Sequence, residues 1–136
     1  MKPLIALFLS SLLLSVSMTV RAEKIKASDY TELTPDQFSA LSHNKTIKGV
    51  FKGKYYAETY IAGEGGGKVS GYFDGTPYHG KWKNGKNNCI LLEYDWEGKP
   101  TCWKLLGKEG KYVYGMYNKK GKKPRYLHFV EITDSD

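Results

Sequence analysis

The sequence predicts an all-β fold: a small antiparallel meander barrel of about eight strands with one short N-terminal helix. Three observations support it: apolar and polar residues alternate after Asn44, turn-forming separators recur at short intervals, and the strand segments are rich in aromatic residues. A meander of this length covers its edges best by closing on itself, although a two-sheet β-sandwich is an alternative. The expected strands are residues 46–51, 54–62, 68–73, 78–83, 89–94, 101–106, 112–117 and 125–132.

The separators between these segments contain the residues that hairpin turns require. Almost all of them carry Gly, Asn or Asp, which adopt a positive φ at little cost. Examples are Lys52-Gly53, Asp74-Gly75 and Asn84-Gly85. The short separators indicate that strands adjacent in the sequence are also neighbours in the sheet.

One helix is predicted, over residues 34–43. Thr34 is the expected N-cap, Pro35 the first helical residue, and Gln37 lies three residues after the cap, which makes a capping box. Phe38 and Leu41 give the helix an apolar side. A short helix packed against one end of the barrel is therefore expected.

Residues 1–22 have the layout of a secretory signal peptide. Lys2 precedes a long apolar run, and Val20-Arg21-Ala22 is a cleavage box that predicts cutting after Ala22. An uncleaved membrane anchor is the alternative. Residues 23–33 are polar and without periodicity, and we expect a flexible leader or a short extended arm. The rest, residues 34–136, is expected to be a single β-barrel domain that is periplasmic or secreted and has no membrane span after cleavage.

The chain is basic, and much of the charge lies in one predicted turn. It has 21 basic and 14 acidic residues, a net charge of +7, and loss of residues 1–22 would leave +5. The basic turn could bind an acidic envelope component or an acidic protein, or could simply be a solvated tip that protects strand edges. Nucleic acid is not expected as a partner of an exported barrel. The anion-binding candidates are Lys119, Lys120, Lys122, Lys123 and Arg125.

Two cysteines in an exported chain predict one disulfide, between Cys89 and Cys102. The predicted register opposes this pairing. A turn centred on residues 97 and 98 would place Cys89 opposite Leu106 and Cys102 opposite Glu93, which is too far for a disulfide. A bulge or a wider loop between the two strands would be needed to bring the thiols together.

Aromatic residues in the strands are the candidates for the barrel interior. Their rings could fill a narrow barrel or line a shallow cavity in it. The candidates for core or ligand-binding aromatics are Tyr72, Trp82, Trp103, Tyr112 and Phe129.

The sequence shows no catalytic or metal-binding constellation. His43, His79 and His128 lie in separate segments without ligand spacing, and no nucleophile is placed near a base. We therefore expect no enzyme activity, no metal and no cofactor.

The layout from Leu33 to Phe129 resembles a family of small secreted bacterial domains of unknown function. The matching features are the helix opening at Leu33-Thr34-Pro35, the Gly80-x-Trp82 motif, Cys89 and Cys102-Trp103. The resemblance implies an exported, β-rich domain, and we expect a lipocalin-like or otherwise calycin-like barrel. The expected function is a non-enzymatic binding module. Alternatives are a protein inhibitor, similar in plan to the periplasmic lysozyme-inhibitor barrels but with an acidic target, and an enzyme with an unrecognised site.

Overall fold

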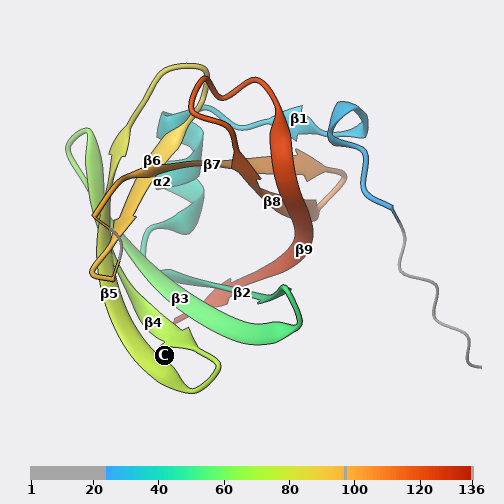
Figure 1. The fold of residues 1–136 in the computed structure, drawn as a ribbon. Helices are drawn as coiled ribbons and strands as arrows, with labels where there is room; N and C mark the ends of the chain where they lie inside the picture. The colour runs from blue at the N-terminus through green and yellow to red at the C-terminus, as the bar shows by residue number, and fades with distance from the viewer. Residues whose placement is uncertain (1–23, 97, 136) are drawn as a thin grey trace, which may run out of the picture.

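Eight antiparallel strands form a closed barrel in the computed structural model, which describes residues 24–96 and 98–135 (Figure 1). Each strand pairs with the next one in the sequence, and β9 returns to pair with β2, which closes the barrel and excludes the sandwich. The strands are β2 (Lys45–Phe51), β3 (Lys54–Gly63), β4 (Gly66–Phe73), β5 (Thr76–Asn84), β6 (Ile90–Tyr94), β7 (Thr101–Lys108), β8 (Lys111–Tyr117) and β9 (Pro124–Asp134).

Among the described residues, four hairpins have two-residue turns, at residues 52–53, 64–65, 74–75 and 109–110. In the pairs Lys52-Gly53, Asp74-Gly75 and Glu109-Gly110 both residues have a positive φ, between 50° and 82°. Two successive positive φ values are typical of a type I′ turn, whose twist matches that of the flanking strands. These turns set the register of three hairpins and hence which side chains point into the barrel.

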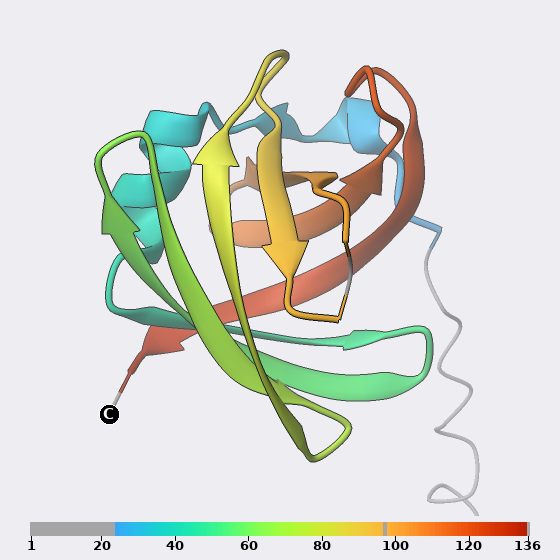
Figure 2. The same ribbon diagram turned by 60° about the vertical axis from the view of Figure 1, so that its left-hand side comes forward.

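One helix, α2 (Pro35–Ser42), covers one end of the barrel (Figure 2). Thr34 is its N-cap, and the predicted capping box with Gln37 is present in full. Phe38 is completely buried and packs edge-on against Tyr60 and Trp82. The helix therefore closes this end of the barrel with an aromatic side chain.

The segment expected to be a flexible leader contains two short elements. These are the 3-10 turn η3 (Ala27–Asp29) and the strand β1 (Thr31–Glu32), which pairs with β7. Ile25, Ala27 and Tyr30 pack on a second apolar cluster that lies outside the main core and includes both cysteines. This apolar contact and the pairing of β1 hold the arm against the barrel.

The predicted disulfide between Cys89 and Cys102 is present, with the two Cα atoms 5.1 Å apart. The predicted register between β6 and β7 was wrong. Leu92 pairs with Thr101, so the connection is wider than a tight turn. Cys89 precedes the paired part of β6 and follows Asn87 and Asn88, both of which have a positive φ. The backbone at this corner turns Cys89 toward Cys102, which the strand ladder alone would not do.

The predicted signal peptide, residues 1–22, lies outside the described residues, and the proposed cleavage after Ala22 stays a prediction. Within the described ranges, no helix has the length and apolar character needed to span a membrane.

Candidate functional site

The barrel contains a cavity of about 550 Å³ that is lined mainly by aromatic side chains. Its exposed lining residues come from the β2–β3 turn, the β4–β5 turn and the β6–β7 connection, so the cavity opens to solvent there. Its volume lies within the range of known small-ligand sites, roughly 300–1,000 Å³. The lining residues are Phe51, Lys52, Lys54, Tyr56, Glu58, Phe73, Asp74, Thr76, Pro77, Tyr78, Tyr94, Trp96, Thr101, Trp103, Tyr114 and Met116.

Among the described residues that line this cavity, one acid, Glu58, has a buried side chain. Tyr56, Glu58 and Tyr60 occupy alternate positions on β3, are all buried, and therefore share the inward face of the strand. Glu58 is only 4% exposed. Burying an acid at this depth is costly unless its oxygen atoms accept hydrogen bonds.

Three tyrosine hydroxyls donate hydrogen bonds to Glu58. Tyr78 and Tyr94 donate to Oε1, at 2.5 and 2.9 Å, and Tyr60 donates to Oε2. The hydroxyl of Tyr114 lies 3.0 Å from that of Tyr60, which extends the network by one more ring. Tyrosines from β3, β5 and β6 thus bond directly to one carboxyl group, and Tyr114 on β8 joins the network through Tyr60.

Burial raises the pKa of Glu58 above its ordinary value, and the hydrogen bonds from Tyr60, Tyr78 and Tyr94 oppose that rise. The pKa values of the tyrosines are raised as well, first by burial and then by the charge of Glu58. The phenols therefore stay protonated at neutral pH and remain hydrogen-bond donors.

A second polar pair lies on the wall of the barrel. The hydroxyl of Tyr56 and Nε2 of His128 are 2.5 Å apart, and both residues are buried. Burial lowers the pKa of His128 to about 4, so the imidazole is neutral at pH 7. This histidine does not line the cavity itself, and its neutral imidazole pairs with the Tyr56 hydroxyl without adding a positive charge.

Aromatic rings connect the buried carboxyl group to the opening. Tyr94 stacks on Trp96 with ring centroids 4.7 Å apart, and Tyr78 contacts both rings edge-on, at 5.4 Å from Tyr94 and 4.8 Å from Trp96. Trp96 is 56% exposed, whereas the two tyrosines are buried. The same tyrosines hold Glu58 through their hydroxyls and form the cavity wall through their rings.

The structure separates the aromatic residues predicted for the interior into two groups. Trp82 and Trp103 are buried in the main core, and Tyr112 packs against it, but only Trp103 lines the cavity. Tyr72 and Phe129 are 60% and 44% exposed, so the expectation that they fill the barrel is corrected. Their strand neighbours Phe73 and Val130 contact the core instead, because successive residues of a strand face opposite sides.

Sequence reasoning missed Glu58 and the tyrosines around it. The signal available was the alternation in Tyr56-x-Glu58-x-Tyr60, which puts an acid on the same face as two large rings. The convergence of Tyr78 and Tyr94 on that acid depends on the pairing of distant strands, and no local pattern encodes it.

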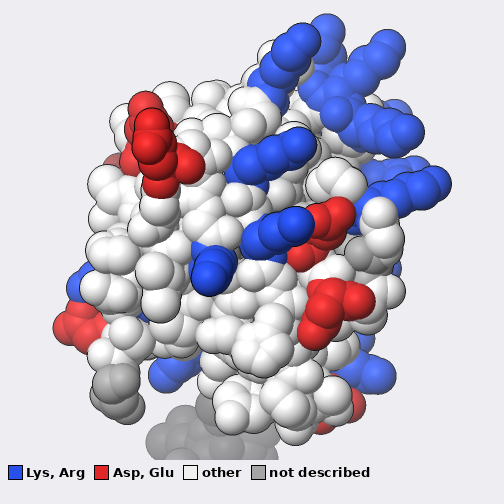
Figure 3. Space-filling view, turned by 90° about the vertical axis from the view of Figure 1, so that its left-hand side faces the viewer, with Lys and Arg blue, Asp and Glu red and all other residues white. Residues whose placement is uncertain are grey.

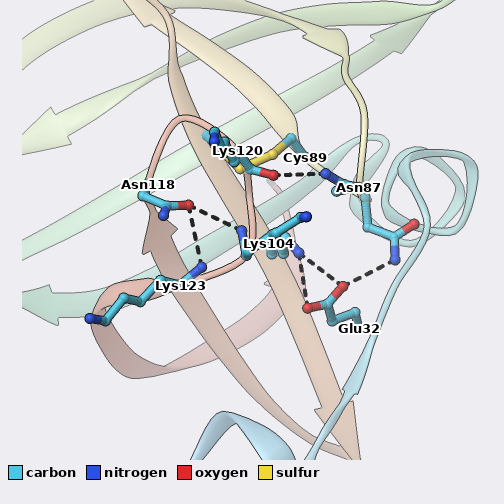
Figure 4. A network of polar contacts seen from close by, with 10 residues as sticks. Glu32, Asn87, Cys89, Lys104, Asn118, Lys120 and Lys123 are labelled. Atoms are coloured by element: carbon cyan, nitrogen blue, oxygen red, sulfur yellow. Dashed lines mark hydrogen bonds and ion pairs between the residues drawn. A yellow bond between two sulfur atoms is a disulfide. The ribbon is translucent and has the colours of Figure 1, made fainter.

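The predicted basic tip lies in the connection between β8 and β9, and hydrogen bonds hold its backbone in place. The Asn118 side chain accepts hydrogen bonds from the backbone N–H groups of Lys122 and Lys123, and the Asn87 side chain donates to the carbonyl of Lys120 (Figure 4). A Cβ added to Gly121 would lie only 2.6 Å from Sγ of Cys89, so the loop packs directly on the disulfide. The contact also joins the β8–β9 loop to the β5–β6 loop.

Joining the two loops enlarges the basic surface beyond the predicted tip. Lys83 and Lys86, on and after the end of β5, are exposed like the tip residues. The sequence has no acidic residue between Asp74 and Glu93 or between Glu109 and Glu131. Figure 3 shows lysine and arginine side chains crowded at one upper corner of the face that it displays. We define the basic surface as Lys83, Lys86, Lys119, Lys120, Lys122, Lys123 and Arg125.

Lys104 is separate from this basic surface. It is 2% exposed, and its ammonium group donates to both carboxylate oxygens of Glu32 on β1, at 3.0 and 2.9 Å (Figure 4). The Asn88 side chain donates to the same carboxylate. This ion pair attaches β1 to the outer wall of the barrel, which is a structural role.

No group of acidic, histidine or cysteine side chains in the described part of the chain is arranged to hold a metal ion. Comparison of the chain with family models, with curated proteins and with solved structures finds no match.

Proposed function

We propose that this chain is an exported, non-enzymatic binding module that holds a small organic ligand inside the barrel. The observation that carries the proposal is the open cavity of about 550 Å³, with rings on its walls and one buried carboxyl group. Apolar walls with a few convergent polar groups are typical of small-ligand sites. The signal-peptide pattern and the Cys89–Cys102 disulfide support an oxidising compartment, periplasmic or extracellular.

The cavity also favours ligand binding over the alternatives that the sequence left open. A protein inhibitor would be expected to have a filled barrel and a protruding recognition loop. An enzyme of the acid–base type would be expected to place a histidine beside a carboxylate. Among the described residues, no histidine forms an ion pair with an acid, and the buried His128 has Tyr56 as its hydrogen-bond partner.

The proposal is tested by filling the cavity. Met116 lines the cavity and is only partly buried, so the larger side chain of Met116→Trp should occupy the cavity space. Val50 lies on the outer face of β2 and is 53% exposed, so Val50→Trp is the matched control. We expect the fluorescent apolar probe N-phenylnaphthylamine to bind the wild type and Val50→Trp and to lose affinity for Met116→Trp. Equal binding to all three proteins would refute the cavity as the site.

The basic surface supports a second candidate function, docking on an acidic envelope component. The observation in its favour is the hydrogen bond between Asn87 and Lys120, which brings two lysine-bearing loops together. Clustered, exposed cations attract anionic surfaces over distances of about a Debye length, roughly 8 Å at physiological salt.

Vesicle co-sedimentation tests this second function. Reversing the charge of Lys119, Lys120, Lys122 and Lys123 should abolish binding to phosphatidylglycerol vesicles at low salt. A matched variant that reverses four exposed lysines elsewhere, Lys68, Lys81, Lys108 and Lys111, should keep it. If both variants lose binding equally, the attraction comes from net charge and the basic surface is not a specific site.

A further inference from the structure

We propose that the cavity takes an organic cation, a molecule with an aromatic or compact apolar body and a protonated amine or quaternary ammonium group, with that group held between Glu58 and the surrounding tyrosine rings. This inference rests on the proposed function, because it names the class of ligand for the same cavity. Three features of the described residues carry it: the lone acid, the arrangement of the rings and the charges at the opening.

The first feature is a buried acid without a basic partner. None of the ion pairs formed within residues 24–96 and 98–135 involves Glu58. Lys104, the one buried lysine among these residues, is paired with Glu32 on the outer wall. All the hydrogen bonds described for Glu58 come from neutral phenols. A positively charged group from outside the chain is therefore the complement that this site lacks.

The acceptor capacity of Glu58 is only partly used. A carboxylate offers about four lone-pair positions, and three phenols occupy three of them. Oε1 accepts from Tyr78 and Tyr94, whereas Oε2 accepts only from Tyr60. Oε2 can therefore accept one further hydrogen bond from the N–H of a protonated amine, whereas a quaternary ammonium group, which has no N–H, would interact with it through charge alone.

The second feature is the set of rings around the acid. Tyr78 and Tyr94 bond to Glu58 through their hydroxyls and pack with Trp96 nearer the opening. Trp103 and Tyr114 line the same cavity with ring centroids 5.0 Å apart. The face of an aromatic ring is electron-rich and attracts cations, and sites for quaternary ammonium groups are built from such rings. Rings and acid thus favour the same sign of ligand charge.

The third feature is the balance of charge at the opening. Lys54 lies 3.9 Å from Asp74, and both residues are exposed. Lys52 is exposed too, with its ammonium 5.3 Å from the centre of the Phe51 ring. Water and salt screen such exposed charges much more than they screen a buried one. The charges at the opening therefore oppose the entry of a cation only weakly. The buried acid, Glu58, determines which sign of ligand charge the cavity favours.

Three ligands of one shape and different charge test the inference. Benzylammonium, benzyl alcohol and benzoate each join one ring to one small polar group. Titrations followed by the indole N–H signals of Trp96 and Trp103 report on the cavity directly, since both residues line it. We expect the Kd of benzylammonium to be lower than that of benzyl alcohol by about tenfold or more, because a desolvated cation is attracted by the faces of the surrounding rings. Benzoate should bind most weakly.

Two substitutions assign the preference to the acid. Glu58→Gln should remove the advantage of benzylammonium over benzyl alcohol, whereas Glu131→Gln, which removes an exposed acid from β9, should leave it unchanged. If Glu58→Gln folds poorly, Tyr94→Phe keeps the ring, removes one hydrogen bond to Glu58, and should still bind the cation in preference to the alcohol.

The outcomes separate this inference from the proposed function. If all three ligands bind the wild type with equal affinity and Met116→Trp blocks them, the cavity is a binding site but its preference for cations is refuted. If benzoate binds most tightly, the preference is refuted in favour of an anion at Lys52 and Lys54. If no ligand shifts either indole signal, both the inference and the proposed function are overturned.

Discussion

Reducing the disulfide between Cys89 and Cys102 should lower the free energy of unfolding by about 3 kcal/mol. The two cysteines are 13 residues apart in the sequence. The chain-entropy relation for a loop of that size gives about 3 kcal/mol at 25 °C, because the bond restricts the unfolded chain. In a domain of this size such a change should lower Tm by on the order of 10 °C.

The assay is urea unfolding of the same protein with and without a phosphine reductant. Comparing oxidised with reduced wild type keeps both sulfur atoms in place, so lost packing contributes little to the difference. A double variant, Cys89→Ala with Cys102→Ala, should lose more than the reduced protein because both side chains are buried. A loss below about 1 kcal/mol on reduction would refute the chain-entropy reasoning.

The disulfide prediction has a second, local readout. Gly121 packs on the sulfur atoms, and the backbone N–H groups of Lys122 and Lys123 bond to Asn118. Reduction should therefore increase hydrogen exchange at Lys122 and Lys123 before the barrel unfolds. Unchanged exchange at these two amides would mean that Asn118 holds the loop without help from the disulfide.

Three further predictions concern stability. As pH falls from 7 to 4, the unfolded chain gains a proton at His128 near pH 6.5 while the folded protein, with a His128 pKa of about 4, does not. The free energy of unfolding should therefore drop by up to about 3 kcal/mol over this range. Urea unfolding of the wild type and of His128→Gln at several pH values measures this drop. If the free energy of unfolding falls no more for the wild type than for His128→Gln, the prediction is contradicted. Thr34→Ala removes the N-cap of α2 and should lower the free energy of unfolding, measured in urea, by about 1 kcal/mol. No measurable loss would show that the capping box does not stabilise the fold. By the same assay, Phe38→Ala should lower the free energy of unfolding by about 3–5 kcal/mol. Tyr72→Ala, at an exposed position, should change it by no more than about 0.5 kcal/mol. Equal losses for the two variants would contradict the burial of Phe38.

The elements of this fold could be predicted closely because their signals are local. Turn residues such as Lys52-Gly53 and Asp74-Gly75 delimit the strands, and Thr34, Pro35 and Gln37 start the helix within one turn of chain. The expected and observed strands agree to within about two residues at most ends for this reason.

The candidate site was less predictable because it depends on register and on closure. Tyr72 and Phe73 are adjacent, and only the pairing of β4 with its neighbours decides which of them faces the core. A tight turn at residues 97 and 98 was predicted for the connection from β6 to β7, but the strand pairing ends at Leu92 and Thr101, so the register at Cys102 was misjudged by two residues. The cysteine pairing itself was predicted correctly, because the sequence contains two cysteines and each has only the other as a possible disulfide partner within the chain.

The sequence by itself determined an all-β chain with a capped helix, a predicted export signal, a disulfide and a basic loop, because composition and short-range patterns encode each of these. Only the tertiary structure decided that the barrel is hollow at one end, that the β5–β6 loop joins the basic tip, and that Glu58 lies among three tyrosine hydroxyls. The physical reason is that residues 20 to 56 positions apart in the sequence come into contact only when the strands close into a barrel. The same closure surrounds Glu58 with tyrosine hydroxyls and leaves it without a basic side chain as partner in the described part of the chain.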